Sequence, residues 1–386
     1  MRIAIVVDYS LDLIGGAQRA VLNQAAVLTG AGHHVLLIGP RPRGAAAALP
    51  PGVSTLWTAG PVLPLLGLPL VADDHGLRDR LRHRMRVERI DAVHLHSELG
   101  HAAAARAAAR RLGLPVVQTV HTAYWPDVPA PLRPATRALL TRLAGAEPVR
   151  TGHPLLDRTL AAADAADVVV SPSAHQAADL VRLGVPDPVV VPNCDPSGAV
   201  ATPLPGGPAL RVAWIGRCVP EKRLLPFLRG VALARRRLPA DSLRVTVAGD
   251  GVLLPVARAL HAGAPGLLLA GRLERPAVQR LIEASHLSAL TSHGFDNQPM
   301  TVVESVRAGR GVLHTDPRLA EGMDPALLTA TPDAEGIADL LVALALDPAR
   351  VRRSAERAQA AAALFSPQAH LAALLPLLAG TARLAA

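Results

Sequence analysis

Residues 210–238 read LRVAWIGRCVPEKRLLPFLRGVALARRRL and contain the repeating unit that decides the fold. The apolar run Leu210–Ile215 predicts a buried strand, and a helical pattern follows over Leu224–Leu238. Between them lies a short loop with a glycine and three basic residues, at the carboxyl end of the strand. A buried strand followed directly by a helix is the building block of a parallel sheet with helices on its faces.

The same unit recurs along both halves of the chain. We therefore predict an α/β fold with two Rossmann-like, doubly wound domains that face each other across a cleft. Ligands of such sheets bind beyond the carboxyl ends of the strands, so this cleft is the expected site. Strands are expected at residues 2–8, 34–38, 92–95, 115–120, 168–170, 188–191, 210–215, 243–248, 267–270, 287–291 and 311–314.

A shift in composition marks the domain boundary. The stretch Pro196–Pro208 is uncharged and rich in Pro and Gly, which is typical of an interdomain linker. Residues 366–386 have a helical pattern and are expected to form a C-terminal helix that can return to the N-terminal domain. The expected division is an N-terminal domain over 1–195, a linker over 196–209 and a C-terminal domain over 210–365.

Composition excludes several classes of protein. The 386 residues are 50% hydrophobic with a mean hydropathy of +0.28, which rules out a mainly disordered chain. Aromatic residues make up only 2%, so stacking platforms for single-stranded nucleic acid are excluded. Of the 40 basic residues, one is Lys222 and the other 39 are arginines scattered along the chain. We expect these arginines on solvated helix faces, and we expect no nucleic-acid partner.

Cysteine usage and hydropathy predict a cytoplasmic protein that can be membrane-associated. The cysteines Cys194 and Cys218 form no C-x-x-C pair, and a chain of this size needs no disulfide scaffold. The first apolar stretch meets Asp8 too early for a signal peptide. Prolines interrupt the uncharged stretches 44–72 and 358–382, so neither predicts a membrane helix.

His94 and His96 lie on one face at the end of a predicted strand. Two histidines at this spacing can bind a metal, but no third ligand is evident in the sequence. A core or cleft-lining role is therefore favoured. We expect neither a metal nor a cofactor.

Arg217 and Lys222 lie five residues apart in the loop after Leu210–Ile215. A diphosphate is well matched by such a pair, because arginine supplies a planar fork of donors and lysine a point charge. The alternative is an ordinary basic turn in which Glu221 pairs with Lys222. Because Lys222 is the only lysine of the chain, the functional interpretation is favoured.

Residues 293–305 read HGFDNQPMTVVES and follow another predicted strand. Asp296 falls in the loop, at the positive end of the dipole of the helix that follows. Glu304 lies about one turn inside that helix, where its carboxylate can accept hydrogen bonds from two vicinal hydroxyls, as in a ribose. The loop amides between them can hold sugar hydroxyls or phosphate. The alternative is a plain helix N-cap followed by a solvated glutamate.

Gly15 and Gly16 precede a helix expected over Ala17–Thr29. Glycines at this place let backbone N–H groups approach an anion, although a plain turn is the alternative. The pattern is not G-x-G-x-x-G, so a nicotinamide-dependent oxidoreductase gains no support.

In this order, the motifs resemble glycosyltransferase family 4, which comprises retaining nucleotide-sugar transferases of GT-B architecture. The resemblance covers the chain from Met1 to Phe365. Its most specific part is the Gly-Arg-x4-Lys element together with the helix that follows Asp296. The matching elements are Gly15-Gly16, His121, Asn193-Cys-Asp195, Gly216-Arg217…Lys222, Gly271-Arg272-Leu273 and Asp296-x7-Glu304.

The resemblance implies transfer of a sugar from a UDP- or GDP-sugar to a hydroxyl acceptor, which can be a glycan, a lipid or a small molecule. The N-terminal domain would be the acceptor side and the C-terminal domain would bind the nucleotide sugar. Arg217 and Lys222 would hold the diphosphate, and Glu304 would hold the ribose. The other implied contacts are His121 at the reacting centre, Asp296 by the donor sugar, Asn297, Gln298, Pro299 and Met300 at that sugar or the phosphate, Arg272 and Leu273 at the base, and Gly15 and Gly16 near the phosphates and acceptor.

Three departures from the family pattern bear on this interpretation. Asp296 replaces a glutamate, Asn297-Gln298-Pro299 replaces Gly-Phe-Gly, and Cys194 replaces a glycine. These changes leave a non-catalytic sugar-nucleotide-binding relative as an alternative. A further alternative is a peripheral membrane enzyme that contacts a lipid acceptor through the apolar loop Leu63–Val71.

Overall fold

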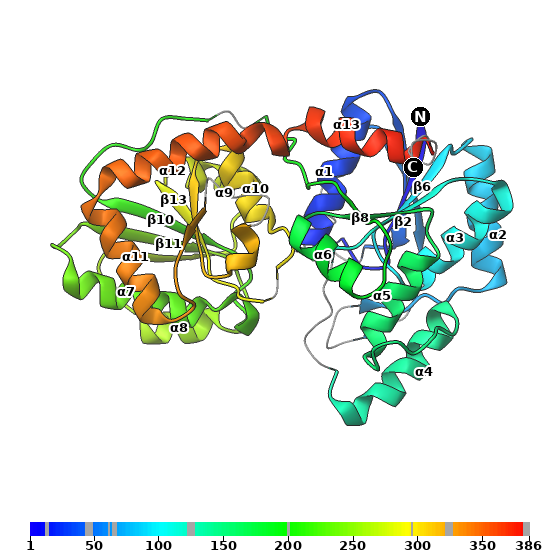
Figure 1. Ribbon diagram of the computed structural model, residues 1–386, viewed down its shortest axis with the longest axis horizontal. Helices are drawn as coiled ribbons and strands as arrows, with labels where there is room; N and C mark the ends of the chain where they lie inside the picture. The colour runs from blue at the N-terminus through cyan, green and yellow to red at the C-terminus, as the bar shows by residue number, and fades with distance from the viewer. Residues whose placement is uncertain are drawn as a thin grey trace. The chain divides into compact units, whose positions relative to one another are not determined.

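The computed structural model describes residues 1–11, 15–42, 49–60, 62–63, 68–121, 128–198, 201–294, 296–320 and 327–380. The chain divides into two compact units (Figure 1). Unit 1 comprises Met1–Pro196 together with Pro367–Ala386, and unit 2 comprises Ser197–Ser366. The last helix of the chain therefore packs with the N-terminal half. Residues 64–67 of the loop Leu63–Val71 lie outside the described residues.

Unit 1 is built on a parallel sheet with its first strand in the interior. Among the described residues the strand order is β3-β2-β1-β6-β7-β8-β9. The chain moves outward in one direction from β1 and in the other from β6, so the topological switch point lies between these two strands. The strands are β1 (Arg2–Val6), β2 (His34–Pro40), β3 (Val53–Thr58), β6 (Ala92–Leu95), β7 (Val116–Thr119), β8 (Val168–Ser171) and β9 (Val189–Val190), with a small antiparallel pair of β4 (Val62–Leu63) and β5 (Leu68–Pro69).

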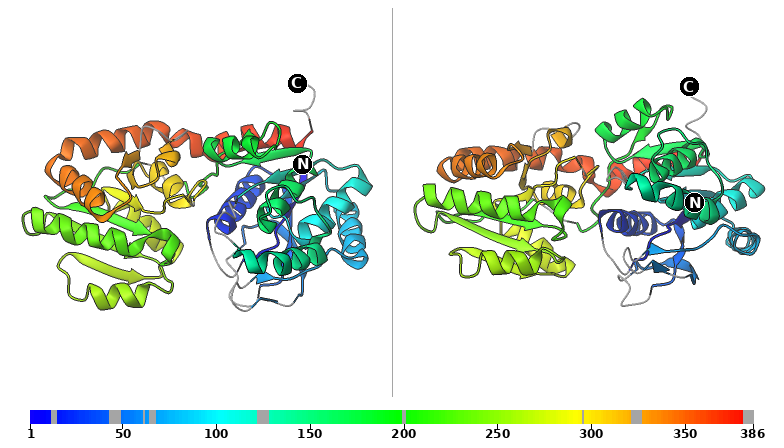
Figure 2. Two further views of the ribbon diagram at one scale, coloured as in Figure 1. Left: turned by 60° about the horizontal axis from the view of Figure 1, so that its bottom comes forward. Right: turned by 90° about the horizontal axis from the view of Figure 1, so that it is seen from below.

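Helices cover both faces of the unit 1 sheet (Figure 2). Successive side chains of a strand point to opposite faces. Ile3 and Ile5 accordingly pack with α1 and α13, whereas Ala4 and Val6 pack with α2 and α3. Helices exclude water from both faces of β1, which is why its buried residues 3–6 are all apolar. The helices are α1 (Gly16–Gly30), α2 (His75–Val87), α3 (Gly100–Leu112), α4 (Arg133–Ala144), α5 (Pro154–Asp164), α6 (Ala174–Arg182) and α13 (Pro367–Leu378).

Unit 2 repeats the same topology. Its described strands follow the order β12-β11-β10-β13-β14-β15 and are all parallel, with the switch point between β10 and β13. Trp214 and Phe227 are fully buried in its apolar core. The elements are β10 (Leu210–Ile215), β11 (Leu243–Ala248), β12 (Leu267–Gly271), β13 (Leu287–Leu290), β14 (Gly311–His314), β15 (Leu327–Thr329), α7 (Leu224–Arg237), α8 (Leu254–Leu260), α9 (Arg275–Glu283), α10 (Met300–Arg307), α11 (Ala334–Leu346) and α12 (Pro348–Ala361).

A glycine allows the turn after β11 to meet the loop after β10. Gly249 follows β11 and has φ +150°, and a Cβ atom there would lie 1.8 Å from the carbonyl oxygen of Gly216. Side chains other than glycine would collide with that backbone and would strain their own. The turn after β11 therefore lies directly against the loop after β10.

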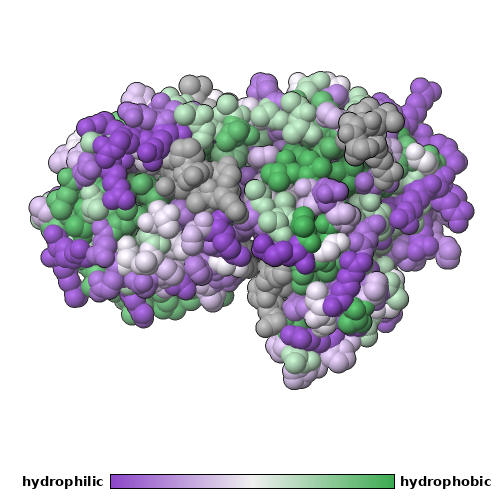
Figure 3. All heavy atoms as spheres, viewed as in Figure 1, coloured by the Kyte–Doolittle hydropathy of each residue, from purple (hydrophilic) through white to green (hydrophobic). Residues whose placement is uncertain are grey.

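Helix α2 illustrates how the arginine-rich sequence forms an amphipathic helix. Leu77, Leu81 and Met85 are buried, while Arg80 and Arg86 are exposed on the other side. Figure 3 shows the hydrophilic surface that results over this helix. Asp74 begins the helix, because its carboxylate accepts the N–H of Leu77 at 2.7 Å.

One described helical stretch, Pro348–Leu378, is long and apolar enough by length and composition to cross a membrane. The structure divides it, because Ser366 has an extended conformation (φ −74°, ψ 153°) between α12 and α13. Helix α12 belongs to unit 2, whereas α13 belongs to unit 1 and buries Leu374 completely. The interruption lies next to Pro367, one of the prolines that the sequence analysis noted in residues 358–382.

Candidate active site

The loop between β10 and α7 carries Arg217 and Lys222. Its backbone follows the turn after β11, since the N–H of Cys218 donates to the carbonyl of Asp250 at 2.8 Å. A short 3₁₀ turn over Pro220–Lys222 then leads into α7. The Arg217 side chain is 55% exposed and the Lys222 side chain only 16%. Both cations thus lie at the switch point of the unit 2 sheet, where a doubly wound sheet binds its ligands.

An ion pair joins this loop to the loop after β13. Lys222 Nζ lies 2.5 Å from Asp296 Oδ1, and the Asp296 side chain is only 12% exposed. The hydroxyl of Ser292 also donates to this carboxylate. The alternative pairing of Lys222 with Glu221 is not what the structure has, because Glu221 contacts Arg217 instead, with Nη2 to Oε1 at 3.3 Å.

The backbone of Lys222 is fixed from the core. The hydroxyl of Thr291 donates to the Lys222 carbonyl at 2.9 Å, and the indole N–H of Trp214 donates to that same hydroxyl at 2.9 Å. Trp214 is 2% exposed and sits in β10, the strand at the switch point. The packing of the core thereby sets the position of Lys222.

The loop after β13 is anchored by Asp316, which follows β14. Its carboxylate accepts the N–H of Gly294 at 2.7 Å and the guanidinium of Arg318 at 3.0 Å. Burial by itself would raise the pKa of Asp316, but the bonds from Arg318 and Gly294 outweigh it, and the pKa is lowered. An ionised Asp316 therefore holds the start of the segment that carries Asp296.

Two hydroxyl groups of helix α10 hold it against strands β10 and β13. The hydroxyl of Thr301 donates to the carbonyl of Ile215 at 3.2 Å, and that of Ser305 donates to Ser288 at 2.7 Å. Glu304, on the same helix, is half-buried. Of the other predicted residues of this segment, Asn297 is half-buried and the side chains of Gln298, Pro299 and Met300 are buried.

Arg272 and Leu273 follow β12, the outermost strand on that side of the described sheet. Strand β11 separates β12 from β10. The Arg272 side chain is exposed and that of Leu273 is half-buried. They therefore belong to the same edge of the sheet as the two cations, two strands further out.

In unit 1, the N-terminus of α3 is occupied by Asp8. This buried carboxylate accepts the N–H groups of Leu99 at 2.8 Å and His101 at 2.6 Å, and the hydroxyl of Ser97 at 2.7 Å. Burial by itself would raise the pKa of Asp8, but the hydrogen bonds from His101 and Ser97 and the electrostatic effect of His101 outweigh it, and the pKa is lowered. Asp8 thus ties the loop after β1 to the loop after β6.

The two predicted glycines play different parts at the start of α1. The N–H of Gly15 donates to Oε1 of Gln18 at 3.1 Å, so Gly15 is the N-cap of the helix. A Cβ on Gly15 would lie 2.8 Å from that same oxygen. At Gly16 no heavy atom of the described residues that surround the helix comes within 4 Å of a Cβ position.

His121 follows β7 and stacks on His96. Their ring centroids are 5.0 Å apart with an interplanar angle of 14°, and His96 Nδ1 lies 2.7 Å from His121 Nε2. Burial lowers the pKa of His121 to about 4, and the charge of His370 acts in the same direction. His121 is therefore neutral at physiological pH.

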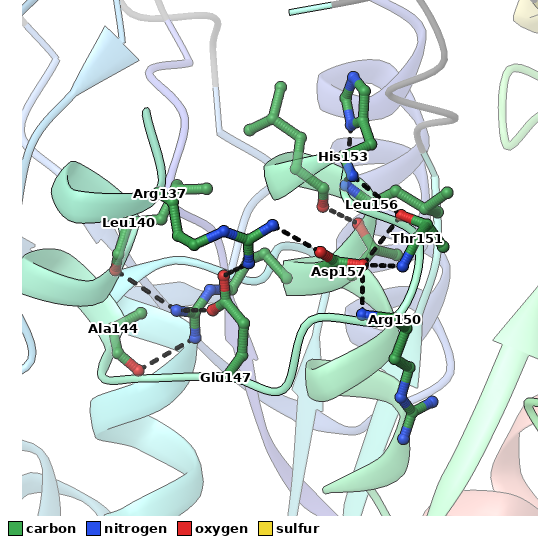
Figure 4. Close-up of polar contacts among 12 residues, drawn as sticks. Arg137, Leu140, Ala144, Glu147, Arg150, Thr151, His153, Leu156 and Asp157 are labelled. Atoms are coloured by element: carbon green, nitrogen blue, oxygen red, sulfur yellow. Dashed lines mark hydrogen bonds and ion pairs between the residues drawn. The ribbon is translucent and has the colours of Figure 1, made fainter. Parts of the chain in front are cut away.

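Buried charges also join α4 to α5 (Figure 4). Arg137 reaches Asp157 with Nη2 to Oδ2 at 2.7 Å, and the fully buried Glu147 pairs with Arg137 and Arg158. Arg158 also donates to the carbonyl of Ala144 at 3.1 Å and so caps α4. Burial lowers the pKa of Arg158 to about 10.

The expectation that the arginines lie on solvated helix faces is therefore wrong for Arg158 and Arg310. These side chains are 4% and 0% exposed. Arg310 donates to the carbonyls of Ser285 at 2.8 Å and Thr202 at 2.7 Å. A guanidinium has five donors, so carbonyls left over at the ends of helices and loops can replace its hydration shell.

Several residues that build the site were missed by sequence reasoning. Thr291, Ser292 and Asp316 are short polar residues directly after a strand, and this position at the carboxyl end was the available signal. Arg318 gave no signal, because it is one of 39 arginines in the sequence and nothing there distinguishes it. Of the predicted residues, the structure brings Lys222 and Asp296 into direct contact.

Comparison with known proteins shows what parts of this chain are similar to. Residues 14–194 match the model of Glycosyltransferase Family 4. Over 127 residues, the chain is 33% identical to alpha-monoglucosyldiacylglycerol synthase of Acholeplasma laidlawii. That match spans 32% of this chain and 30% of the relative. The resemblance stated from the sequence is thereby confirmed.

Solved structures confirm the predicted fold. HepE of Anabaena in complex with UDP has a TM-score of 0.68 at 15% identity, over 98% of this chain and 100% of that one. The same protein with UDP-glucose gives 0.66 at 15% identity, over 99% of each chain. Sucrose-phosphate synthase from Thermosynechococcus elongatus gives 0.65 at 14% identity, over 99% of this chain and 98% of the other. The architecture is GT-B.

The Asp8 cap makes a prediction about stability and pH. Replacing Asp8 by Asn should lower the free energy of unfolding at pH 7 by about 2–3 kcal/mol, because buried N–H groups lose a charged acceptor. The folded-state pKa is below the ordinary value of 3.8, so this contribution is present above that value and is lost as pH falls through the folded pKa. Urea unfolding from pH 7 to pH 3 measures the difference.

The control is Asp79→Asn, because Asp79 has a 68% exposed side chain on α2. It should change the free energy of unfolding by less than about 0.5 kcal/mol at every pH. An Asp8→Asn protein as stable as the parent at pH 7 would show that the cap does not stabilise unit 1.

Proposed function

We propose that this protein is a retaining glycosyltransferase, because residues 14–194 match the model of Glycosyltransferase Family 4 and the chain has the GT-B fold. It transfers a sugar from a nucleotide-diphosphate donor to a hydroxyl acceptor. The observation that carries the proposal is the pair of Lys222 and Asp296, which joins the two loops at the switch point of unit 2. A loop with an exposed guanidinium and a largely buried ammonium at this place suits a diphosphate.

The donor is a UDP- or GDP-sugar, and UDP has the better support. Structures of HepE with UDP and with UDP-glucose have the same fold as this chain. Arg217 and Lys222 bind the diphosphate, and Glu304 accepts the ribose hydroxyls. Asp296 lies beside the donor sugar. The other assigned contacts are Asn297, Gln298, Pro299 and Met300 at the sugar or phosphate, Arg272 and Leu273 at the base, His121 at the reacting centre, and Gly15 and Gly16 near the phosphates and acceptor.

The reaction proceeds with retention on the front face of the sugar. The bond between the anomeric carbon and the phosphate oxygen breaks, and the acceptor oxygen forms its bond to that carbon from the same side. The acceptor proton passes to the departing phosphate. Arg217 and Lys222 stabilise the charge that develops on this leaving group. No metal takes part, and no side chain serves as a covalent nucleophile.

Asp296 bears on the alternative of a non-catalytic relative. It keeps a carboxylate where the family has glutamate, and this carboxylate holds the ammonium of Lys222 at 2.5 Å. The cation is therefore in place for catalysis despite the shorter side chain. Release of UDP from UDP-glucose by the purified protein separates the enzyme from a protein that only binds.

A lipid acceptor is the second candidate, with the protein in the cytoplasm at a membrane surface. It is favoured by the name of the curated relative, a synthase of a glucosylated diacylglycerol. Helix α2 adds exposed arginines, among them Arg80 and Arg86, that an anionic membrane attracts.

The loop that carries Arg217 and Lys222 gives the central test of the activity. Arg217→Ala and Lys222→Ala should each slow the release of UDP from UDP-glucose by about 10²–10³, since each removes a preorganised charge from the leaving group. The matched control is Arg229→Ala, an exposed arginine on α7, which should keep the parent rate. Steady-state kinetics with UDP-glucose measure all three variants. Normal turnover in both loop variants would contradict the assignment of Arg217 and Lys222 to the leaving diphosphate.

Glu304 tests the ribose contact separately. Glu304→Gln should raise the KM for UDP-glucose about tenfold with little change in kcat, because a weaker acceptor lowers binding equally in the ground and transition states. Glu335→Gln, an exposed glutamate at the start of α11, is the control and should leave KM unchanged. An unaltered KM in the Glu304 variant would place the ribose elsewhere.

The lipid-acceptor version predicts binding to anionic vesicles. The protein should co-sediment with phosphatidylglycerol vesicles and not with phosphatidylcholine vesicles. The double variant Arg80→Glu with Arg86→Glu should weaken this binding at least about tenfold, since each basic residue contributes about 1 kcal/mol near such a surface. Arg229→Glu with Arg236→Glu on α7 is the control, because it changes the net charge equally. Equal loss in both pairs would mean that no particular face docks.

A further inference from the structure

A continuous chain of side-chain hydrogen bonds runs through the interior of unit 1 and ends at His121. Gln24 of α1 places Nε2 2.8 Å from His94 Nδ1 and 3.3 Å from His96 Nε2. His94 Nε2 lies 2.7 Å from the hydroxyl of Thr119, and His96 Nδ1 lies 2.7 Å from His121 Nε2. Gln24, His94, His96 and Thr119 are each at most 5% exposed.

The amide of Gln24 sets the direction of every bond in this chain. Its nitrogen has two hydrogens to donate and no lone pair to offer, so the ring nitrogens that face it must both be acceptors. These are Nδ1 of His94 and Nε2 of His96. A neutral imidazole carries one hydrogen, so His94 is protonated on Nε2 and His96 on Nδ1. His94 then donates to Thr119.

The same argument extends one ring further. His96 donates from Nδ1 to His121 Nε2, so the hydrogen of His121 must be on Nδ1. We propose that Gln24 is a positioning residue that acts through His96 to hold His121 in one orientation and in the Nδ1–H tautomer. This inference rests on the proposed function, because that proposal places His121 at the reacting centre.

Neutral rings are a condition for this arrangement, and the surroundings meet it. The titratable groups that act on the three rings are the rings themselves and His370 of α13, whose Nδ1 lies 2.8 Å from the carbonyl of Pro192. Burial lowers the pKa of His94 and of His96 well below the ordinary value, and neighbouring histidines act in the same direction. A proton added to the chain would set two N–H groups against each other.

The fixed tautomer defines what His121 does in transfer. Its Nε2 accepts from His96, and its Nδ1 carries a hydrogen. His121 is therefore a hydrogen-bond donor through Nδ1 and does not remove the acceptor proton there. This agrees with the front-face reaction, in which the departing phosphate takes that proton. Gln24 and His96 serve the reaction without contact with the substrate.

The tautomers can be read directly by NMR on the full chain with ¹⁵N-labelled histidine. Long-range ¹H–¹⁵N spectra should show a protonated Nδ1 and an unprotonated Nε2 for His121, with no change between pH 8 and pH 6. His96 should show the same pattern. The variants His121→Gln and His96→Gln identify the signals. A hydrogen on Nε2 of His121, or an imidazolium at pH 6, overturns the proposal without any assay of activity.

The variant Gln24→Met tests the origin of the effect. It removes the donor at similar volume, so His121 should populate the Nε2–H tautomer, and kcat for UDP release from UDP-glucose should fall about tenfold at unchanged KM. The control is Asn23→Leu, one residue away on α1, which removes the equally buried amide that donates to the Cys194 carbonyl at 2.8 Å. This control should change stability and leave the tautomers and kcat as they are.

The outcomes separate this inference from the proposed function. An unchanged tautomer in folded Gln24→Met overturns the role of Gln24. A changed tautomer with a normal kcat overturns the link between this chain and catalysis. A parent protein that releases no UDP from UDP-glucose, while its spectra show the expected tautomers, contradicts the proposed function. It does not contradict the inference that Gln24 fixes the tautomer of His121. If Gln24→Met does not fold, the spectrum of the parent protein decides.

Discussion

The contact between Lys222 Nζ and Asp296 Oδ1 joins two loops of unit 2, and the proposed donor site depends on it. It exists because β10 and β13 are neighbours in the sheet although the chain between them visits β11 and β12 first. That crossover leaves two loops side by side at the same edge. With little exposure to water, the pair is screened less than a surface ion pair, and it holds both loops at one separation.

Much of the fold could be predicted from the sequence because its strands are apolar on both faces. Leu210–Ile215 forms the strand expected there, and the family resemblance and the GT-B fold are confirmed. Strand β3 was missed because residues 44–72 are uncharged and proline-rich, so the loop residues around the strand hide its pattern. Helices α4 and α5 were missed because charges that look solvated in the sequence, such as those of Glu147 and Arg158, are buried against each other.

The sequence allowed us to predict candidate residues of the site, but not which of them contact each other. Lys222 stood out as the only lysine, yet its partner lies 74 residues away, and only the strand order brings the two together. Glu221 is adjacent in sequence but turns to Arg217. The histidines of β6 were assigned to the core or cleft correctly as to burial, but Gln24, which orders them, lies 70 residues from His94 on another helix.

Unit 2 fixes Lys222 by an ion pair with Asp296, whereas unit 1 fixes its buried histidines by hydrogen bonds between neutral groups. An ammonium has three donors, so Lys222 can keep Asp296 and still donate to a diphosphate oxygen; the carboxylate offsets its charge until that anion arrives. The histidine chain of unit 1 consists instead of neutral rings directed by an amide, which fix a hydrogen without adding charge. A site that must stabilise developing negative charge gains most when its only cations face the leaving group. Under the proposed function, which places His121 at the reacting centre, neutral histidines meet the same requirement.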